Sequence, residues 1–312
     1  MSNIQAGKIS VVTIFLNGLP WLREAIESVL AQTGVNFEYI LVDDGSVDGS
    51  SELGKSYAAQ FPGIVRYIDH PGHANRGMSA SRNAGVAVAA GEYLAFIDAD
   101  DIWKPGKLER QLSIFSRFPE LAMVADSAIY WSSWNDGTDK TILAGHLQNQ
   151  PVNSPDALLH TYPLGRAHAP CPSGILIRRS AYEAVGGFEA SFTGPLQMYE
   201  DQAFLSKVYL RFPVLFADDC DLLYRQHPSS CVAENVRSGN YGQVRLHFLQ
   251  WLGAYLEREG TNDPRIRAAL RRALLPFRFP NLYAFLRRLI RLSRKVARPV
   301  LRQVRQTKPR PV

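Results

Sequence analysis

Residues 93–101 read YLAFIDADD, an apolar run that ends in the carboxylates Asp98, Asp100 and Asp101. The aromatic and β-branched residues of this run predict a buried strand. Open α/β sheets bind their ligands at the carboxyl ends of their strands, so we expect these carboxylates to face a binding crevice. Asp-x-Asp alone arises by chance about once in a chain of this length, so its meaning depends on the neighbouring segments.

The segments before this stretch alternate between strand and helix patterns. Further apolar runs predict buried strands at residues 10–16, 38–42 and 64–68. Apolar residues at helical spacing predict helices at residues 22–30 and 79–90, the second of them stopped by Gly91. The resulting order β-α-β-α-β-α-β predicts parallel strands with right-handed crossovers.

Acidic residues follow two of these strands, because Asp43 and Asp44 end the second run. Both acidic groups can therefore face one crevice. Ordinary turn chemistry is the alternative for Asp44, with Asp48 as a cap of the next helix. For the stretch at 98–101, the alternative is an acidic turn in which Asp101 caps a helix that begins near residue 104.

Five ordered motifs make the chain resemble the family 2 glycosyltransferases of the GT-A type. They lie at residues 11–17, 25–33, 42–50, 79–85 and 91–101. The resemblance covers roughly residues 8–228 and implies an α/β fold, with a Rossmann-like nucleotide-binding sheet and an acceptor half. One departure is that many members carry a Pro and a Tyr where this chain has Ile14 and Leu16.

The resemblance also implies where a nucleotide-sugar donor binds. It assigns donor contacts to Leu16, Asp44, Arg82 and Asp98, with Asp44 at the nucleobase or ribose. It makes Asp100 the direct ligand of Mn²⁺ or Mg²⁺, with Asp98 facing the ribose or a metal-bound water. Oxygen ligands suit these hard cations. For Arg82, a solvated charge beside a helix start is the alternative.

The second half must supply a base, and residues 199–202, YEDQ, precede a helical pattern. An Asp at a helix start is more often a cap. The resemblance instead implies that Asp201 is the general base, with Glu200 orienting it or touching the acceptor. Residues 171–174 are candidates for the acceptor pocket or a simple turn.

Three further side chains are candidates for contact with the diphosphate or the acceptor: Arg76, Arg225 and His227. His227 follows the last predicted strand, and an imidazole there is also a candidate metal or phosphate partner.

The predicted function is an inverting, metal-dependent transfer of a sugar from a nucleotide-diphospho-sugar, with UDP as the expected nucleotide, to a hydroxyl acceptor. Cell-surface polysaccharide or glycan synthesis would suit it. The alternative is a catalytically silent sugar- or nucleotide-binding scaffold, and a phosphatase with an Asp-x-Asp nucleophile stays open. Residues 15–20 lack the Gly-x-Gly-x-x-Gly that a Rossmann dehydrogenase needs.

The charge is divided between two parts of the chain. Residues 264–312 hold 15 Lys and Arg and no Asp or Glu, which leaves a net charge of −9 on residues 1–263. Apolar positions between 282 and 290 recur at helical spacing opposite basic ones, a pattern typical of helices on anionic membranes. A helix packed on the protein or a partner is the alternative, and nucleic acid is not expected because no other motif supports it.

Composition sets the remaining expectations. Residues 132–156 are polar and turn-rich and predict a long excursion, while residues 1–232 form the predicted catalytic domain and residues 233–312 a helical, basic extension. Residues 1–8 lack the apolar core of a signal peptide, so we expect a cytoplasmic protein, peripheral on the inner face of the membrane. Three widely spaced cysteines favour neither a disulfide framework nor a zinc site.

Overall fold

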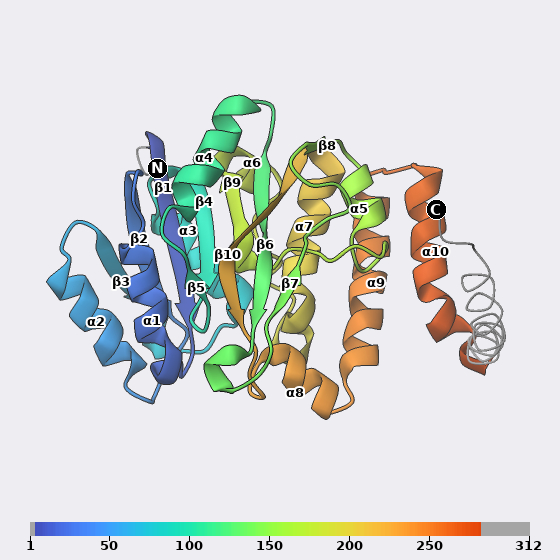
Figure 1. The fold of residues 1–312 in the computed structure, drawn as a ribbon. Helices are drawn as coiled ribbons and strands as arrows, with labels where there is room; N and C mark the ends of the chain where they lie inside the picture. The colour runs from blue at the N-terminus through green and yellow to red at the C-terminus, as the bar shows by residue number, and fades with distance from the viewer. Residues whose placement is uncertain (1–3, 282–312) are drawn as a thin grey trace, which may run out of the picture. The chain divides into compact units, whose positions relative to one another are not determined.

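A computed structural model describes residues 4–281 of the chain (Figure 1). By its contacts the chain divides into two compact units, Met1–Thr261 and Asn262–Val312. The first unit contains a ten-stranded sheet in the order β3-β2-β1-β4-β9-β6-β10-β5, with β7 beside β6 and β8 beside β10.

The first half of the sheet is parallel, as predicted. Its strands are β1 (Gln5–Phe15), β2 (Phe37–Asp43), β3 (Val65–Asp69) and β4 (Gly91–Asp98). The helices between them are α1 (Leu19–Leu30), α2 (Ser50–Gln60) and α3 (Met78–Val88). Ile14 of β1 pairs with Val42 on one side and Asp98 on the other, so the acidic ends of β2 and β4 flank the end of β1.

The second half joins the first through an antiparallel strand. β9 (Ile175–Arg178) pairs antiparallel with both β4 and β6, whereas β10 runs parallel to β6. The other elements of this half, apart from short 3-10 turns, are β5 (Ile102–Trp103), α4 (Lys107–Arg117), β6 (Met123–Trp131), β7 (Lys140–Ile142), β8 (Pro151–Val152), α5 (Asp156–His160), α6 (Arg179–Ala184), α7 (Glu200–Arg211), β10 (Val214–Arg225), α8 (Cys231–Arg237) and α9 (Tyr241–Arg258).

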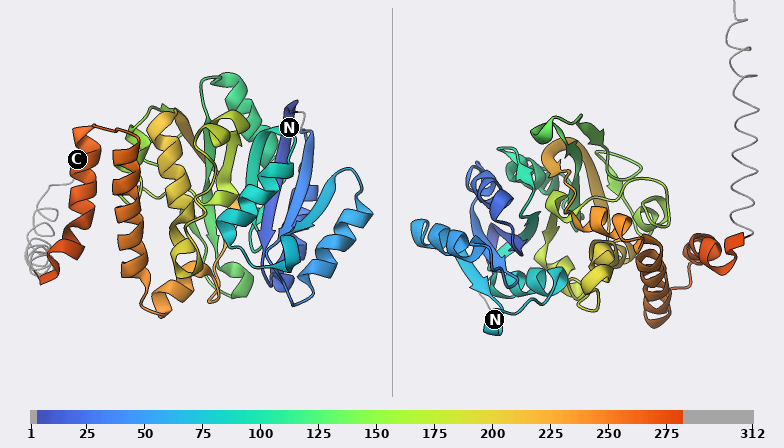
Figure 2. Two further views of the ribbon diagram at one scale, coloured as in Figure 1. Left: turned by 180° about the vertical axis from the view of Figure 1, so that it is seen from behind. Right: turned by 90° about the horizontal axis from the view of Figure 1, so that it is seen from below.

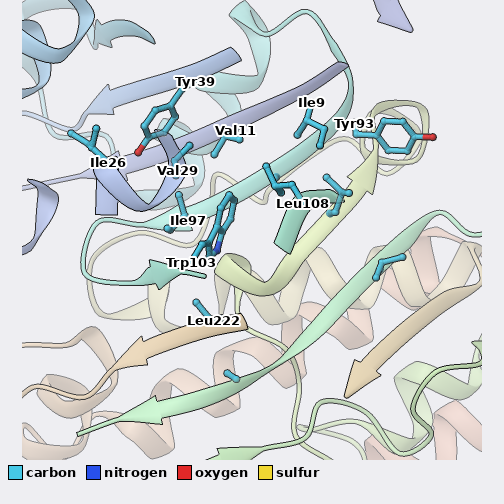
Figure 3. Packing of buried hydrophobic residues seen from close by; sticks show 14 of the residues in the cluster. Ile9, Val11, Ile26, Val29, Tyr39, Tyr93, Ile97, Trp103, Leu108 and Leu222 are labelled. Atoms are coloured by element: carbon cyan, nitrogen blue, oxygen red, sulfur yellow. The ribbon is translucent and has the colours of Figure 1, made fainter. Parts of the chain in front are cut away.

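A hydrophobic core fills the space between the sheet and helices α1, α2 and α4 (Figure 3). Ile26 and Val29 of α1 meet Val11 and Ile97 of the strands there, and Trp103 packs among them. Helix α3 covers the opposite face of the sheet, as Figures 1 and 2 together show.

Gly85 sets the distance between α3 and the sheet. A Cβ atom there would lie 2.5 Å from a methyl carbon of Val12, so only glycine lets α3 pack directly on β1. This close packing fixes the position of Arg82, which lies one turn earlier on the same helix.

Several predicted boundaries differ from the structure. Asp101 does not cap a helix near residue 104, because its buried carboxylate has other partners and α4 begins only at Lys107, after Gly106. Helix α3 ends at Val88, and Gly91 is the first residue of β4 rather than a helix stop.

Helices follow the sheet, as predicted for the chain from residue 233. α8 and α9 belong to the first compact unit, and α10 (Pro264–Arg278) belongs to the second. The domain boundary at 232 stays a prediction. The predicted amphipathic helix at 282–290 lies outside the described residues. In the described part of the chain, helices are too short or too polar to cross a membrane.

Candidate active site

A cavity of about 300 Å³ opens at the carboxyl ends of β1 and β4. We call it the donor cavity. Its lining includes Leu16 and Trp21 after β1, Asp44 after β2, and both carboxylates of the Asp-x-Asp motif, Asp98 and Asp100. The crevice expected from the strand pattern is therefore present, and the acidic ends of two strands meet in it.

Asp44 is held rigidly at the wall of this cavity. Its carboxylate accepts hydrogen bonds from the backbone N–H groups of Arg76, at 2.7 Å, and Gly77, at 3.0 Å. Gly77 has a φ of 86°, which favours glycine. A carboxylate oxygen has two lone pairs, so Asp44 keeps acceptor capacity for a ligand. Arg76 itself is exposed, and its side chain does not line the donor cavity.

Arg82 links the two halves of the site. Its side chain is buried, so the alternative of a solvated charge is wrong. One guanidinium nitrogen donates to Asp98 at 2.5 Å and another donates to Glu200 at the start of α7. These two carboxylates raise the pKa of Arg82 above its ordinary value against the effect of burial. Phe188 lies under the guanidinium, 5.2 Å from ring centroid to carbon.

Asp100 forms a pair with His227. Nε2 of His227 lies 2.8 Å from Oδ2 of Asp100, and Nδ1 lies 2.9 Å from the hydroxyl of Ser229. The His227 ring is almost buried, while the Asp100 side chain is 31% exposed. The two residues are 127 positions apart in the sequence, and only folding brings them together.

These residues fit a divalent cation that is shared with a ligand. Among the described residues, no group of three or more His, Cys, Asp or Glu side chains forms a complete metal site. Mg²⁺ commonly takes one or two carboxylates and completes its shell with substrate phosphates and water. Asp100 and His227 could hold such an ion, whereas one oxygen of Asp98 is already occupied by Arg82.

Arg225 lies in a cage of three indole rings. Its guanidinium carbon is 4.4 Å from the ring centroid of Trp131, 4.7 Å from that of Trp21 and 5.3 Å from that of Trp134. Nε donates to the backbone carbonyl of Asp100 at 2.8 Å. Arg225 lines neither cavity of the site, so we interpret it as a residue that positions Asp100 rather than one that touches the diphosphate.

Ser173 holds the turn of the Asp-x-Asp motif in place through two hydrogen bonds. Its hydroxyl donates to Asp101 at 2.5 Å and accepts from the backbone N–H of Asp98 at 3.0 Å. The other oxygen of Asp101 accepts from the backbone N–H of Arg225 at 3.1 Å. Burial and the two neighbouring carboxylates raise the pKa of Asp101. Asp101 is therefore a structural residue.

A second cavity, of about 230 Å³, lies next to the donor cavity. We call it the acceptor cavity. Tyr224 and Val232 line both cavities and form the wall between them. Asp201 lines the acceptor cavity from the first turn of α7, and Cys171, from the segment considered for the acceptor pocket, lines it too.

Asp201 has the environment of a proton acceptor. Burial raises the pKa of its carboxyl to about 6. Its protein partners are the backbone N–H and the side-chain amide of Gln202, at 2.6 and 3.2 Å. The residue is not the cap of α7, because Tyr199 occupies that position. Burial also raises the pKa of Glu200, to about 8, against the effect of Arg82.

Comparison with known proteins decides the family. Residues 10–186 match the family described as glycosyl transferase family 2, which is more than half of the chain. The chain belongs to this family. Its mixed α/β sheet has the GT-A architecture, as in solved glycosyltransferases.

Relatives of this family 2 protein match only part of it. An uncharacterized glycosyltransferase of a Nostoc strain is 38% identical over 57% of this chain and 53% of its own length. TuaG of Bacillus subtilis, named for teichuronic acid biosynthesis, is 37% identical over 33% of this chain and 40% of its own. The chain thus spans about half the length of these relatives or less.

Solved structures share the fold. A mannosyltransferase of Pyrobaculum calidifontis, solved with GDP-Man and Mn²⁺, has a TM-score of 0.60 and 17% identity, and the match covers 93% of this chain and 75% of that one. TarS of S. aureus, solved with UDP-GlcNAc, has a TM-score of 0.55 and 18% identity over 72% of this chain and 60% of that one.

Sequence reasoning missed several residues of the site. Trp21 and Trp134 were not singled out, although Trp134 lies in the excursion at 132–156 and packs on Trp21 with ring centroids 4.9 Å apart. Asp126 of β6 and the tyrosines of the acceptor cavity were also missed. None of them belongs to a local motif, so only their shared position in the fold could have pointed to them.

Proposed function

We propose that this protein transfers a sugar, with inversion at the anomeric carbon, from a nucleotide-diphospho-sugar to a hydroxyl of an acceptor. The observation that carries the proposal is the juxtaposition of two cavities. Asp98 and Asp100 line one, Asp201 lines the other, and Tyr224 and Val232 form their shared wall. A reaction between a donor and an acceptor needs such an arrangement.

The donor cavity would bind the nucleotide and its diphosphate. Asp44 would accept a hydrogen bond from the nucleobase or ribose, and Asp98, held by Arg82, would accept one from the ribose. Leu16 is 44% exposed at the rim and would pack on the base. A cation at Asp100 and His227 would neutralise the leaving diphosphate. UDP is our expected nucleotide, because a structural neighbour binds UDP-GlcNAc, while another binds GDP-Man.

Asp201 would act as the general base. Its carboxylate would take the proton of the acceptor hydroxyl while that oxygen forms a bond to the anomeric carbon. The bond between this carbon and the diphosphate oxygen breaks in the same step, and the electron pair leaves with the diphosphate. Arg82 and Glu200 hold the start of α7 beside Asp98, which supports the placement of Asp201 near the donor.

The cellular role is a separate part of the proposal. A relative named for teichuronic acid biosynthesis supports a role in cell-surface polysaccharide or glycan synthesis. The 15 basic residues of 264–312 support peripheral binding to the inner, anionic face of a membrane. Sedimentation with phosphatidylglycerol vesicles would test this, and retention of binding after deletion of residues 264–312 would contradict it.

A thermal-shift screen tests the catalytic proposal. Nucleotide-sugars are added with and without Mn²⁺, and a ligand at a hundred times its Kd should stabilise the protein by about 2.7 kcal/mol. The best donor is then assayed for turnover before and after EDTA. Stabilisation by no nucleotide-sugar would contradict donor binding, and turnover that survives EDTA would contradict the metal requirement. Donor binding without any turnover would favour the silent scaffold.

A further inference from the structure

The acceptor cavity contains an acidic side chain that the proposed reaction does not use. Asp126 lies on β6, is only 3% exposed and lines this cavity. Its buried Oδ2 has no hydrogen bond of good geometry among the described residues, although the side chains of Lys107 and Gln111 lie close enough to lower the pKa of the carboxyl against the effect of burial. Its one ion pair there is with Lys107, whose Nζ lies 3.4 Å from Oδ2.

A buried carboxylate oxygen without a well-formed hydrogen bond is unusual. Buried polar groups nearly always find partners, because an unmet acceptor costs free energy. Lys107 meets only part of this need, because its ammonium donates to Gln111 at 2.9 Å and lies farther from Asp126, at 3.4 Å from Oδ2. Further donors can come from a ligand in the cavity that Asp126 lines, and hydroxyl groups are donors of the right kind.

The rest of the lining indicates what carries these hydroxyls. Tyr162, Tyr199 and Tyr241 join their hydroxyls in one cluster, with 2.6 Å between those of Tyr162 and Tyr241. Tyr130 and Tyr224 add two more rings, with centroids 5.2 Å apart. Tyrosine offers an apolar face with a polar end, which suits the C–H and O–H groups of a sugar ring.

The charge of the acceptor cavity disfavours anionic ligands. In the described part of the chain, its lining contains the carboxylates of Asp126 and Asp201 and no Lys or Arg. A phosphate or carboxylate in the ligand would meet these like charges, and among the described lining residues only the imidazole of His168 could offset them, since Lys107 is fully buried behind Asp126. The volume of about 230 Å³ is also below the range of about 300–1,000 Å³ usual for drug-sized ligands.

We propose that the acceptor cavity binds an uncharged sugar ring, and that Asp126 accepts hydrogen bonds from its hydroxyls. The assignment of this cavity to the acceptor rests on the proposed function. Asp126 is a specificity residue in this view, because an acceptor that bears a uronate or phosphate at the same ring is rejected. It is distinct from Asp201, which takes the proton.

Pairs of acceptors that differ only in charge test whether the acceptor cavity prefers an uncharged sugar ring. The full chain, Mn²⁺ and the UDP-sugar that it hydrolyses fastest are combined with methyl glucoside or methyl glucuronide, and with methyl galactoside or methyl galacturonide. We expect kcat/KM for the neutral member of a pair to exceed that for its uronide at least tenfold. A uronide used as well as its neutral partner, or transfer to no neutral member, would overturn the proposal.

Asp126→Asn tests the residue. It should raise the acceptor KM by about 10- to 100-fold, as expected when a hydrogen bond to a charged group is lost. Asp218→Asn is the matched control, because Asp218 is exposed on the neighbouring strand β10 and lines neither cavity. An acceptor KM equal to that of the control would overturn the role of Asp126.

A double variant separates loss of binding from loss of the fold. Asp126→Asn leaves the Lys107 ammonium unpaired, so Lys107→Met is combined with it to remove both charges. Saturation-transfer NMR with methyl glucoside and methyl galactoside then reports binding without any turnover. Loss of binding in a double variant that unfolds as cooperatively as the wild type supports the proposal, and unchanged binding overturns it. A failure of donor turnover alone would count against the proposed function but not against this binding result.

Discussion

The donor and acceptor cavities are neighbours that are built in different ways. The donor cavity takes its acidic groups from the ends of parallel strands, where Asp44 and Asp98 flank β1. The acceptor cavity takes its side chains from segments spread between residues 126 and 241, with tyrosines as its main polar groups. The acidic groups of the donor cavity are placed by local strand geometry, whereas the acceptor cavity depends on long-range packing throughout. We therefore expect donor chemistry to be common to relatives and acceptor choice to vary.

Replacing the proposed base should have the largest effect and should leave the donor side intact. Asp201→Asn is expected to lower kcat by about 10²- to 10⁴-fold, because positioned general bases contribute about that much. The affinity for UDP, measured by calorimetry, should change less than about twofold. In the wild type, kcat/KM should rise with pH through about 6, the raised pKa of Asp201. A variant with the kcat of the wild type would show that Asp201 is not the general base.

The same substitution should increase stability. The pKa of Asp201 is raised in the folded protein, so ionisation above about pH 6 destabilises the fold, whereas below about pH 4 the carboxyl is neutral in both states. Asp201→Asn should therefore raise the free energy of unfolding at pH 7.5 by about 1–3 kcal/mol and leave it unchanged near pH 3.5. Urea denaturation at both pH values measures this, and equal stability at pH 7.5 would contradict the raised pKa.

Asp100 is the residue of the donor cavity that we expect to bind the metal ion. Asp100→Asn removes the carboxylate that faces His227, so Mn²⁺ binding in the presence of UDP should weaken at least about tenfold, as loss of a supporting group already does at metal sites. Electron paramagnetic resonance of free Mn²⁺ gives the affinity without any turnover. Glu52→Gln, on an exposed helix position, is the control. Unchanged Mn²⁺ affinity would exclude Asp100 as the ligand.

Arg225 should have a smaller effect of the same kind. Arg225→Lys keeps the charge but loses the planar stacking on three indoles and the hydrogen bond from Nε to Asp100. We expect Mn²⁺ affinity with UDP to fall by about 3- to 10-fold, the equivalent of one hydrogen bond, with an unchanged acceptor KM. Arg23→Lys, at an exposed position of α1, is the control. A change in the acceptor KM with unchanged Mn²⁺ affinity would contradict the role of Arg225 in positioning Asp100.

Leu16 should have the smallest effect. Its side chain is 44% exposed, so Leu16→Ala removes little buried area and should raise the donor KM by less than about fivefold. Initial rates at varied donor concentration measure it. A loss of a hundredfold would show that the base packs on Leu16 far more tightly than the apolar contact predicts.

The sequence predicted the donor half well, for a physical reason. Strand and helix periods are local, and parallel strands must end at one edge, so the meeting of Asp44, Asp98 and Asp100 in one cavity followed from the pattern. Arg82 was predicted only by resemblance, and its burial between Asp98 and Glu200 required the close packing that Gly85 allows.

The remainder depended on contacts between distant segments. His227 meets Asp100 across 127 residues, and Asp101 was open to interpretation as a helix cap until Ser173 and Arg225 appeared beside it. A short strand such as β5, with two residues, has too little pattern to be predicted. Asp126 gave no signal at all, because one acidic residue in an apolar run does not reveal whether it faces a cavity.

Ser173 bears on any attempt to exchange acceptor halves between relatives. One hydroxyl holds both the Asp98 backbone and the Asp101 side chain, yet it stands just before β9 in the second half of the chain. A chimera joined just after Asp101 would keep the motif in its sequence but would lose the group that shapes its turn. A chimera should therefore take Ser173 from the same parent as Asp98 and Asp101, because the three residues act together.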